Sequence, residues 1–330
     1  MGGKPMSLLA RVERRQWQPL QNFGFGGGGN NWSGEPVNET TALQVSAVLA
    51  CVGLLADSVA SLPLTAVRKV GDRTVALPTP RLFVDPSPTV TSYELVHQTV
   101  SSLALHGNAY WMLDLGANGE PLAVTPIHPG NVEVMAGATF STRRYFVAGT
   151  EVPAEYIKHI RWWTPPQALK GISPIETQKD TIGLALAMER HLAQFYAEGG
   201  TPSSVLETDG DLTINQAKVL QETWQTQHVR RRKPAVLSGG LKWKPVTASA
   251  ADMELNAARE LQIMQVARIF RVKPSLIGAR GGDSQTYSNT EMDGQHFVTY
   301  TLLPWLRRIE DAMSMLLPRP QFVQIGRAHV

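Results

Sequence analysis

The sequence predicts an α+β fold that is rich in helix. Three stretches have long apolar periodicity of the helical kind, and we expect stiff helices there: residues 173–198, 251–270 and 288–317. Between residues 107 and 163, short β-type runs are separated by Gly, Pro and Asn, a pattern typical of several short strands. With 330 residues and 43% apolar residues, the chain can bury a large core and divide into two or three domains.

The N-terminal third predicts an arm, a helix and a hairpin. Residues 1–38 are rich in Gly and Arg and have few core residues, so we expect a flexible arm. A helix should begin near Thr40 or Thr41 and end at Pro63, followed by paired strands at 64–68 and 73–77. The buried side of this helix is expected to hold Val45, Val48, Leu49, Val52, Leu55 and Val59.

The middle of the chain predicts a further helix and then the short strands. Residues 92–105 have helical periodicity and begin with a capping-type Ser. Five strands are expected after it, at 109–115, 122–128, 132–135, 145–147 and 157–162.

The helix at 173–198 has a clear start signal. Ser173 is suited to the N-cap, Pro174 to the first helical position, and Glu176 to completing a capping box. Its expected packing positions are Ile175, Ile182, Leu186, Leu192 and Phe195.

Residues 200–250 predict a small insert. It should contain a strand at 204–207, a helix at 215–227 and a hairpin at 235–245. Four positive charges stand together in it, and they suit either a solvated helix end or a contact with phosphate or an acidic partner: Arg230, Arg231, Arg232 and Lys233.

A helix at 251–270 leads into a glycine-rich loop at 278–287. The packing stripe of this helix is expected to be Leu261, Met264, Ala267 and Phe270. Gly278, Gly281 and Gly282 make the loop flexible, and Arg280 places one positive charge at its tip.

The helix at 288–317 is the longest of the three. Ser288 and Glu291 have capping-box spacing, so we expect its first turn near Asn289. Pro304 predicts a kink rather than an end. The expected apolar stripe is Met292, Val298, Leu302, Trp305, Ile309, Met313 and Leu316.

The surface of this long helix predicts one ion pair. Arg307 and Asp311 stand one turn apart and are expected to pair. Pro318 and Pro320 should end the helix.

Composition and motifs exclude several functional classes. A net charge of +3 does not indicate a protein that grips nucleic acid tightly, and no apolar run is long enough to span a bilayer. The single cysteine, Cys51, excludes an internal disulfide and is expected to be buried. The spelling G-x-G-x-x-G at residues 24–29 follows no strand, so we expect no dinucleotide or other cofactor.

Two other readings of the residues stay open. One is a hydrolase that uses His128 or His159 with Asp114 or Glu155, although no nucleophile motif or carboxylate pair accompanies them. His97 has no second ligand at a useful spacing. The other reading is a helical scaffold or adaptor that never contacts DNA.

Seven segments of the chain carry a resemblance to a known family. They are HGNAYW (106–111), GISPIE (171–176), ERHLAQFYAEGGTPSSVLE (189–207), GGLKWKPV (239–246), ARIFRVKPSLIG (267–278), YSNTE (287–291) and FVTYTLLPWLRRIE (297–310). In this order they resemble the portal proteins of tailed double-stranded DNA bacteriophages, most of all the compact portals of long-tailed phages. The resemblance runs from about residue 41 to residue 317.

This resemblance implies a ring, usually of twelve subunits, at one capsid vertex. The ring is the channel for DNA packaging and ejection, and the stiff helices suit its walls because each would bury its flanks against a neighbour. The implied parts are a wing (39–170 with 288–317), stem helices (173–198 and 251–276), a clip (200–250) and a tunnel loop (278–287). The family's C-terminal crown is expected to be missing, with residues 318–330 as a truncated tail.

The resemblance also implies partners. Arg280, Gln285 and Lys273 are the expected DNA-facing residues, in a loop made flexible by Gly281 and Gly282. The cluster at 230–233 would lie in or near the clip, which in the family meets the terminase large subunit and later the head–tail adaptor. Other implied partners are further copies of the chain, double-stranded DNA and the major capsid protein, with no membrane. The implied location is the virion, with assembly in the host cytoplasm.

Overall fold

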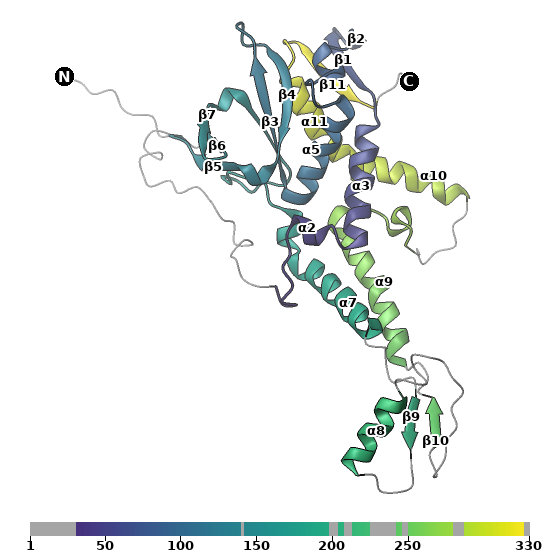
Figure 1. The fold of residues 1–330 in the computed structure, drawn as a ribbon. Helices are drawn as coiled ribbons and strands as arrows, with labels where there is room; N and C mark the ends of the chain where they lie inside the picture. The colour runs from purple at the N-terminus through teal and green to yellow at the C-terminus, as the bar shows by residue number, and fades with distance from the viewer. Residues whose placement is uncertain are drawn as a thin grey trace, which may run out of the picture. The chain divides into compact units, whose positions relative to one another are not determined.

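The computed structural model describes residues 31–139, 142–197, 204–207, 213–224, 242–245, 250–279 and 287–326. It divides into two compact units, which are described separately here. The larger unit comprises residues 1–187 and 259–330, and the smaller comprises residues 188–258. The helix-rich α+β class is confirmed (Figure 1).

Helices α3 (Ser46–Ala60) and α5 (Ser92–His106) pack against each other at the centre of the larger unit (Figure 1). The predicted first helix is broken, because the single turn α2 (Glu39–Ala42) ends before α3 begins. Leu49 was wrongly expected in the core and is 56% exposed. It lies about 100° around the helix from buried Val48, beyond the face that packs inward. The other expected positions are buried: Val45, Val48, Val52, Leu55 and Val59.

A three-stranded antiparallel sheet joins distant parts of the chain. Its central strand is β1 (Leu64–Val70), with β2 (Arg73–Ala76) on one side and β11 (Gln321–Ile325) on the other. The hairpin of β1 and β2 is confirmed, whereas β11 lies where a truncated tail was expected. Helix α11 (Leu303–Ser314) covers the outer edge of β11 with side-chain acceptors. Glu310 Oε1 accepts from Ile325 N–H at 2.9 Å, and Ser314 Oγ accepts from Val323 N–H at 2.8 Å.

The five strands predicted in the middle of the chain are confirmed, in two small antiparallel sheets. The first has the order β4 (Pro121–Ile127), β3 (Asn108–Leu115), β8 (Ile157–Arg161), and the second is β5 (Val132–Ala136), β6 (Arg143–Val147), β7 (Thr150–Val152). Strand β7 was missed because three residues are too short to show alternation. Thr91, not Ser92, is the N-cap of the preceding helix α5. The single turn α4 (Arg81–Val84) lies between β2 and α5.

The helix expected at 173–198 is also interrupted. Ser173 caps α6 (Pro174–Thr177) as predicted, accepting from Glu176 N–H at 3.1 Å. Gln178 then departs from helical geometry, and α7 (Lys179–Ala197) follows. Of the expected packing positions, Ile175, Ile182 and Leu192 are buried.

The long C-terminal helix changes character along its length. It runs through α10 (Tyr287–His296), a π-helical segment η5 (Phe297–Leu302) and α11. The π segment ends just before Pro304, whose missing N–H disturbs the ordinary ladder. Because α10 begins at Tyr287, Ser288 lies inside the helix rather than at its cap. Arg307 pairs with Glu310 at 3.1 Å, not with Asp311.

The apolar stripe of this long helix is buried at only one end. Leu302, Trp305, Ile309, Met313 and Leu316 are buried, as expected. Met292 and Val298 were expected in the same core but are 55% and 50% exposed. The stripe therefore continues past the core of the larger unit.

Helix α9 (Ala250–Phe270) ends earlier than the expected stem helix, and a 3₁₀ turn, η4 (Pro274–Ile277), follows it. Ala267 and Phe270 are buried as predicted, but Leu261 is 49% exposed. Each of the helices that the structure describes is too short or too polar to cross a membrane.

In the smaller unit, β9 (Ser204–Glu207) pairs with β10 (Lys242–Pro245), and α8 (Ile214–Trp224) is the helix. The strand and the helix are confirmed. The expected hairpin at 235–245 is corrected for its last four residues. They pair with β9 instead, and Lys242 lies opposite Glu207, which is 35 residues earlier in the chain. Its other residues lie outside the described part.

Candidate functional site

Most of the expected site residues lie outside the described residues. These are Arg280, Gly281, Gly282 and Gln285 in the loop, and the cluster Arg230, Arg231, Arg232 and Lys233. Their assignment stays a prediction. Lys273 is described, together with both ends of the loop.

The two ends of the glycine-rich loop are tied together. Lys273 stands before the loop, Asp293 stands after it in α10, and their side chains form an ion pair at 2.5 Å. Gly278, at the loop's start, has φ +77°, a left-handed conformation that favours glycine. Lys273 therefore fixes the base of the loop through Asp293 rather than standing as a free cation.

A left-handed arginine ends α9. Arg271 has φ +57°, and its N–H donates to Arg268 O at 3.2 Å while Val272 N–H donates to Ala267 O at 2.9 Å. These two bonds form a Schellman-type C-cap, in which glycine is the usual left-handed residue. Thr301 Oγ donates to Arg271 O at 2.7 Å and holds the turn against the π segment.

The segments HGNAYW and GISPIE pack against each other. A Cβ atom at Gly107 would lie 2.0 Å from Ile172 O, and one at Gly171 would lie 2.2 Å from Gly107 O. Gly107 also ends α5 with φ +67°. Both glycines are therefore required by the close approach of two backbones.

Asn108 completes this junction. Its amide donates to His106 O and Gly171 O, both at 2.8 Å, and its carbonyl accepts from Gly171 N–H at 2.7 Å. Trp111, fully buried, donates from its indole to Thr99 Oγ at 2.8 Å. The HGNAYW segment therefore has a structural role in this chain, because its side chains position strand β3.

The structure brings together three groups that the sequence did not connect. Nε2 of His128 lies 2.9 Å from Glu39 Oε2, and Nε2 of His106 lies 3.2 Å from the same oxygen. Burial by itself raises the pKa of Glu39, but the hydrogen bond from His128 and the nearby His106 lower it overall. Burial also lowers the pKa of His106, which Glu39 offsets only in part. No spacing signal links residues so far apart in sequence.

Hydrogen bonding favours an ionic cluster here over a metal centre. His128 Nδ1 accepts from Gly130 N–H at 3.1 Å, so in the neutral ring Nε2 carries the proton. A metal-bound histidine needs the opposite arrangement, with its free nitrogen donating to an acceptor. The cluster therefore ties α2 to the end of α5.

The expected hydrolase pairs are corrected. His128 contacts Glu39, and Nε2 of His159 lies 3.0 Å from the Asn108 amide oxygen. Burial, reinforced by the nearby charges of Arg161, Arg143 and Lys170, holds the pKa of His159 well below its usual value. Asp114 and Glu155 are exposed and stand apart from these contacts.

The sequence profile of the family described as phage portal protein matches residues 46–326. The chain belongs to the phage portal protein family. Its function is accordingly that of a portal protein, and this family is one of structural proteins rather than enzymes. The resemblance inferred from the seven segments is confirmed.

Named portal proteins are among the relatives. The chain is 30% identical to the probable portal protein of Streptomyces phage phiC31, over 94% of this chain and 71% of that protein. It is 27% identical to the portal protein of Enterobacteria phage HK97, over 100% of this chain and 77% of that protein.

Solved structures share the fold. An HK97-family phage portal protein from Corynebacterium diphtheriae aligns with a TM-score of 0.59 at 18% identity, over 88% of this chain and 96% of that one. The neck of a native gene transfer agent particle computed with C12 symmetry contains a chain that aligns with a TM-score of 0.65 at 24% identity, over 91% of this chain and 88% of that one.

Proposed function

We propose that this portal protein closes into a ring of twelve subunits through which double-stranded DNA is packaged and ejected. The observation that carries the proposal is the uncovered part of the long helix. Met292 and Val298 are about half exposed, although they continue the stripe that is buried from Leu302 onward. Tyr300, on another side of the same helical segment, is 68% exposed. Exposed apolar side chains that continue a buried stripe suit a surface that another protein covers.

A second copy of the chain is the partner that best fits this surface. In Figure 1, α10 runs outward from the core of the larger unit, so a neighbour can reach its flank. A ring repeats one such contact around its axis and leaves no copy uncovered. The C12 symmetry of the gene transfer agent neck supports the number twelve.

We assign the loop at 278–287 to the wall of the channel, where Arg280 and Gln285 would face DNA. The ion pair of Lys273 with Asp293 supports this role because it links the segments on both sides of the loop. A net charge of only +3 suits a conduit, since strong phosphate contacts repeated around a ring would hold DNA still.

The remaining parts of the proposal follow from family membership. The ring would occupy one vertex of the capsid, contact the major capsid protein, and assemble in the host cytoplasm. Residues 200–250 would form the clip, with Arg230 to Lys233 near the docking surface for the terminase large subunit and the head–tail adaptor. Residues 39–170 with 288–317 would form the wing, and 173–198 with 251–276 the stem.

Ring assembly is tested by electron microscopy and native mass spectrometry of purified protein. The natural chain should give end-on rings with a central hole. Val298→Asp should give folded monomers, because a charge on the covered face opposes assembly. Val84→Asp is the matched control: Val84 is 54% exposed in α4, and its variant should still form rings. Rings formed equally well by Val298→Asp would contradict the assigned interface.

The loop assignment has a separate test. Deleting residues 281–284 should leave ring formation intact and impair DNA packaging or retention in particles. Normal packaging by rings that carry the deletion would remove the loop from the channel wall.

A further inference from the structure

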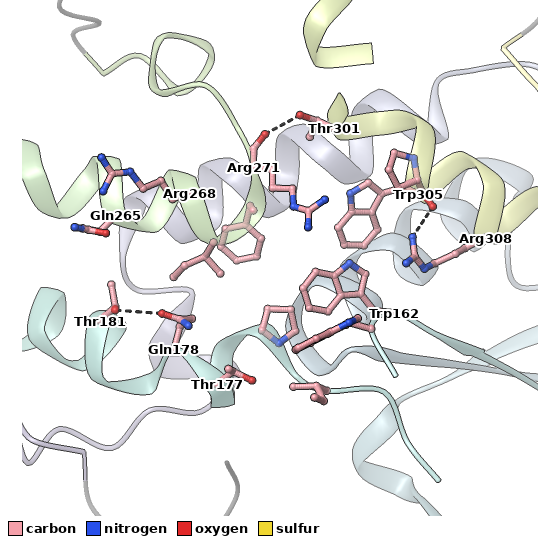
Figure 2. A pocket seen from close by; sticks show the side chains of 16 residues that line it. Trp162, Thr177, Gln178, Thr181, Gln265, Arg268, Arg271, Thr301, Trp305 and Arg308 are labelled. Atoms are coloured by element: carbon pink, nitrogen blue, oxygen red, sulfur yellow. Dashed lines mark hydrogen bonds between the residues drawn. The ribbon is translucent and has the colours of Figure 1, made fainter. Parts of the chain in front are cut away.

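A cavity of about 510 Å³ lies within the larger unit (Figure 2). Its walls come from the end of α9, from α6 and the start of α7, from η5 with α11, and from the segment just after β8. The volume falls within the usual range of small-molecule sites, roughly 300–1,000 Å³. This site belongs to a single subunit, so it goes beyond the proposed ring and does not depend on it.

The lining is cationic. Arg268, Arg271 and Arg308 line the cavity, and its described lining residues include neither Asp nor Glu. Within the described part of the chain, none of these three guanidinium groups forms a salt bridge with an Asp or Glu. Arg268 is exposed near the C-terminal end of α9, where the helix dipole favours a positive charge. Arg271 follows the same helix end, whereas Arg308 lies in α11 and is half-buried.

Arg271 and Arg308 are held near each other by the fold. Figure 2 shows the Arg271 guanidinium pointing into the space beside Trp305, with Arg308 beyond that indole. Arg308 is half-buried and donates to Pro304 O at 2.6 Å. Burial, together with the charge of Arg271, lowers the pKa of Arg308. An anion bound in the cavity would offset the burial of Arg308 and its repulsion from Arg271.

Flat aromatic surface lies next to these charges. The indoles of Trp162 and Trp305 stack with centroids 6.3 Å apart and an interplanar angle of 21°. Trp163, also in the lining, is 58% exposed. Trp305 is only 5% exposed, so the aromatic surface available to a planar base is that of Trp162 and Trp163.

We propose that this cavity binds a nucleotide, with its phosphate held by the arginines of the lining and its base against Trp162 and Trp163. Guanidinium groups bind phosphate through paired N–H donors, and three positive charges match a group with more than one negative charge. The same chemistry is offered by a free nucleotide and by a nucleotide at the end of a DNA strand.

The site is tested by tryptophan fluorescence and calorimetry on the full chain. The probes are dTMP, inorganic pyrophosphate, a short single-stranded oligonucleotide and a glutamate-rich peptide. We expect saturable binding of dTMP, weakened by salt, with pyrophosphate binding less tightly. If the oligonucleotide competes with dTMP, the cavity binds a nucleotide at the end of a DNA strand. If it does not compete, the cavity binds a free nucleotide.

Two variants and a control separate binding from folding. Arg308→Gln and Arg271→Gly should each weaken dTMP binding about tenfold or more, the loss expected for a charge-assisted hydrogen bond. Arg307→Gln makes the same charge change one residue from Arg308, outside the cavity lining, and should change binding less than about twofold.

Three results would overturn the proposal. One is no saturable binding of dTMP or the oligonucleotide. Another is pyrophosphate binding as tight as dTMP, which would remove the role of the tryptophans. The last is binding of the glutamate-rich peptide in preference to dTMP, which would make the cavity a docking site for an acidic protein segment.

Discussion

Replacing Arg271 with glycine should make the protein more stable, although it removes a side chain. Arg271 has φ +57°, where an L-residue is disfavoured by about 1–2 kcal/mol. Glycine removes that penalty, but it raises the conformational entropy of the unfolded chain, which stabilises the unfolded state by about 0.4–1 kcal/mol. The net expectation is a gain of about 0.5–1 kcal/mol in the free energy of unfolding, because both cap hydrogen bonds use only the backbone.

Arg271→Ala separates the backbone effect from the charge effect. Alanine keeps the Cβ atom and therefore the left-handed strain, but it removes the guanidinium. Urea unfolding followed by circular dichroism, at a fixed protein concentration, should order the variants with glycine above alanine. If Arg271→Gly is less stable than the natural chain, or no more stable than Arg271→Ala, the backbone is not strained there and the reasoning fails.

Three further predictions concern positions outside the cavity. Gly107→Ala should lower the free energy of unfolding by at least about 3 kcal/mol, because its Cβ would lie 2.0 Å from Ile172 O. Gly149→Ala, with φ +82° but no atom within 4 Å, should lose only about 1–2 kcal/mol in the same urea titration. Acidification from pH 7.5 to 5.5 should lower the free energy of unfolding by up to about 1.4 kcal/mol through His159. The pKa of His159 is depressed only in the folded state, so over this range the unfolded chain takes up a proton that the folded chain does not. If the His159→Gln variant showed the same pH dependence of stability, this reasoning would be wrong. Glu310→Ala should lower the free energy of unfolding by about 1–3 kcal/mol, because it leaves the Ile325 amide of β11 without an acceptor. Glu310→Gln keeps an acceptor and should lower it less; equal losses in the two variants would show that the charge of Glu310 matters instead.

The sequence was most informative where local periodicity and packing agree. In α3, the positions around Val48 and Leu55 are buried as the period of 3.6 requires. In the long C-terminal helix the same pattern is present throughout, yet Val298 is exposed and Ile309 is buried. Periodicity identifies an apolar face, but it does not say whether the same chain or another covers it.

The contacts that the sequence did not reveal depend on residues far apart in the chain. Glu39 meets His128 across 89 positions, and neither belongs to a spacing pattern that marks a site. The arginine cavity is similar, since Arg271 and Arg308 come from separate helices that only the tertiary fold brings together. Strand β11 was overlooked because its partner, β1, is near the other end of the chain.

The pairing of Leu64 with Ile325 has a consequence for synthesis on the ribosome. At about 5–20 residues per second, β1 emerges roughly 15–50 s before β11 can join it. During that interval one side of β1 has no strand beside it, and an unpaired edge invites contact with other nascent chains. The newly made protein is therefore vulnerable to aggregation until β11 pairs with β1, and a chaperone would have most effect in that interval.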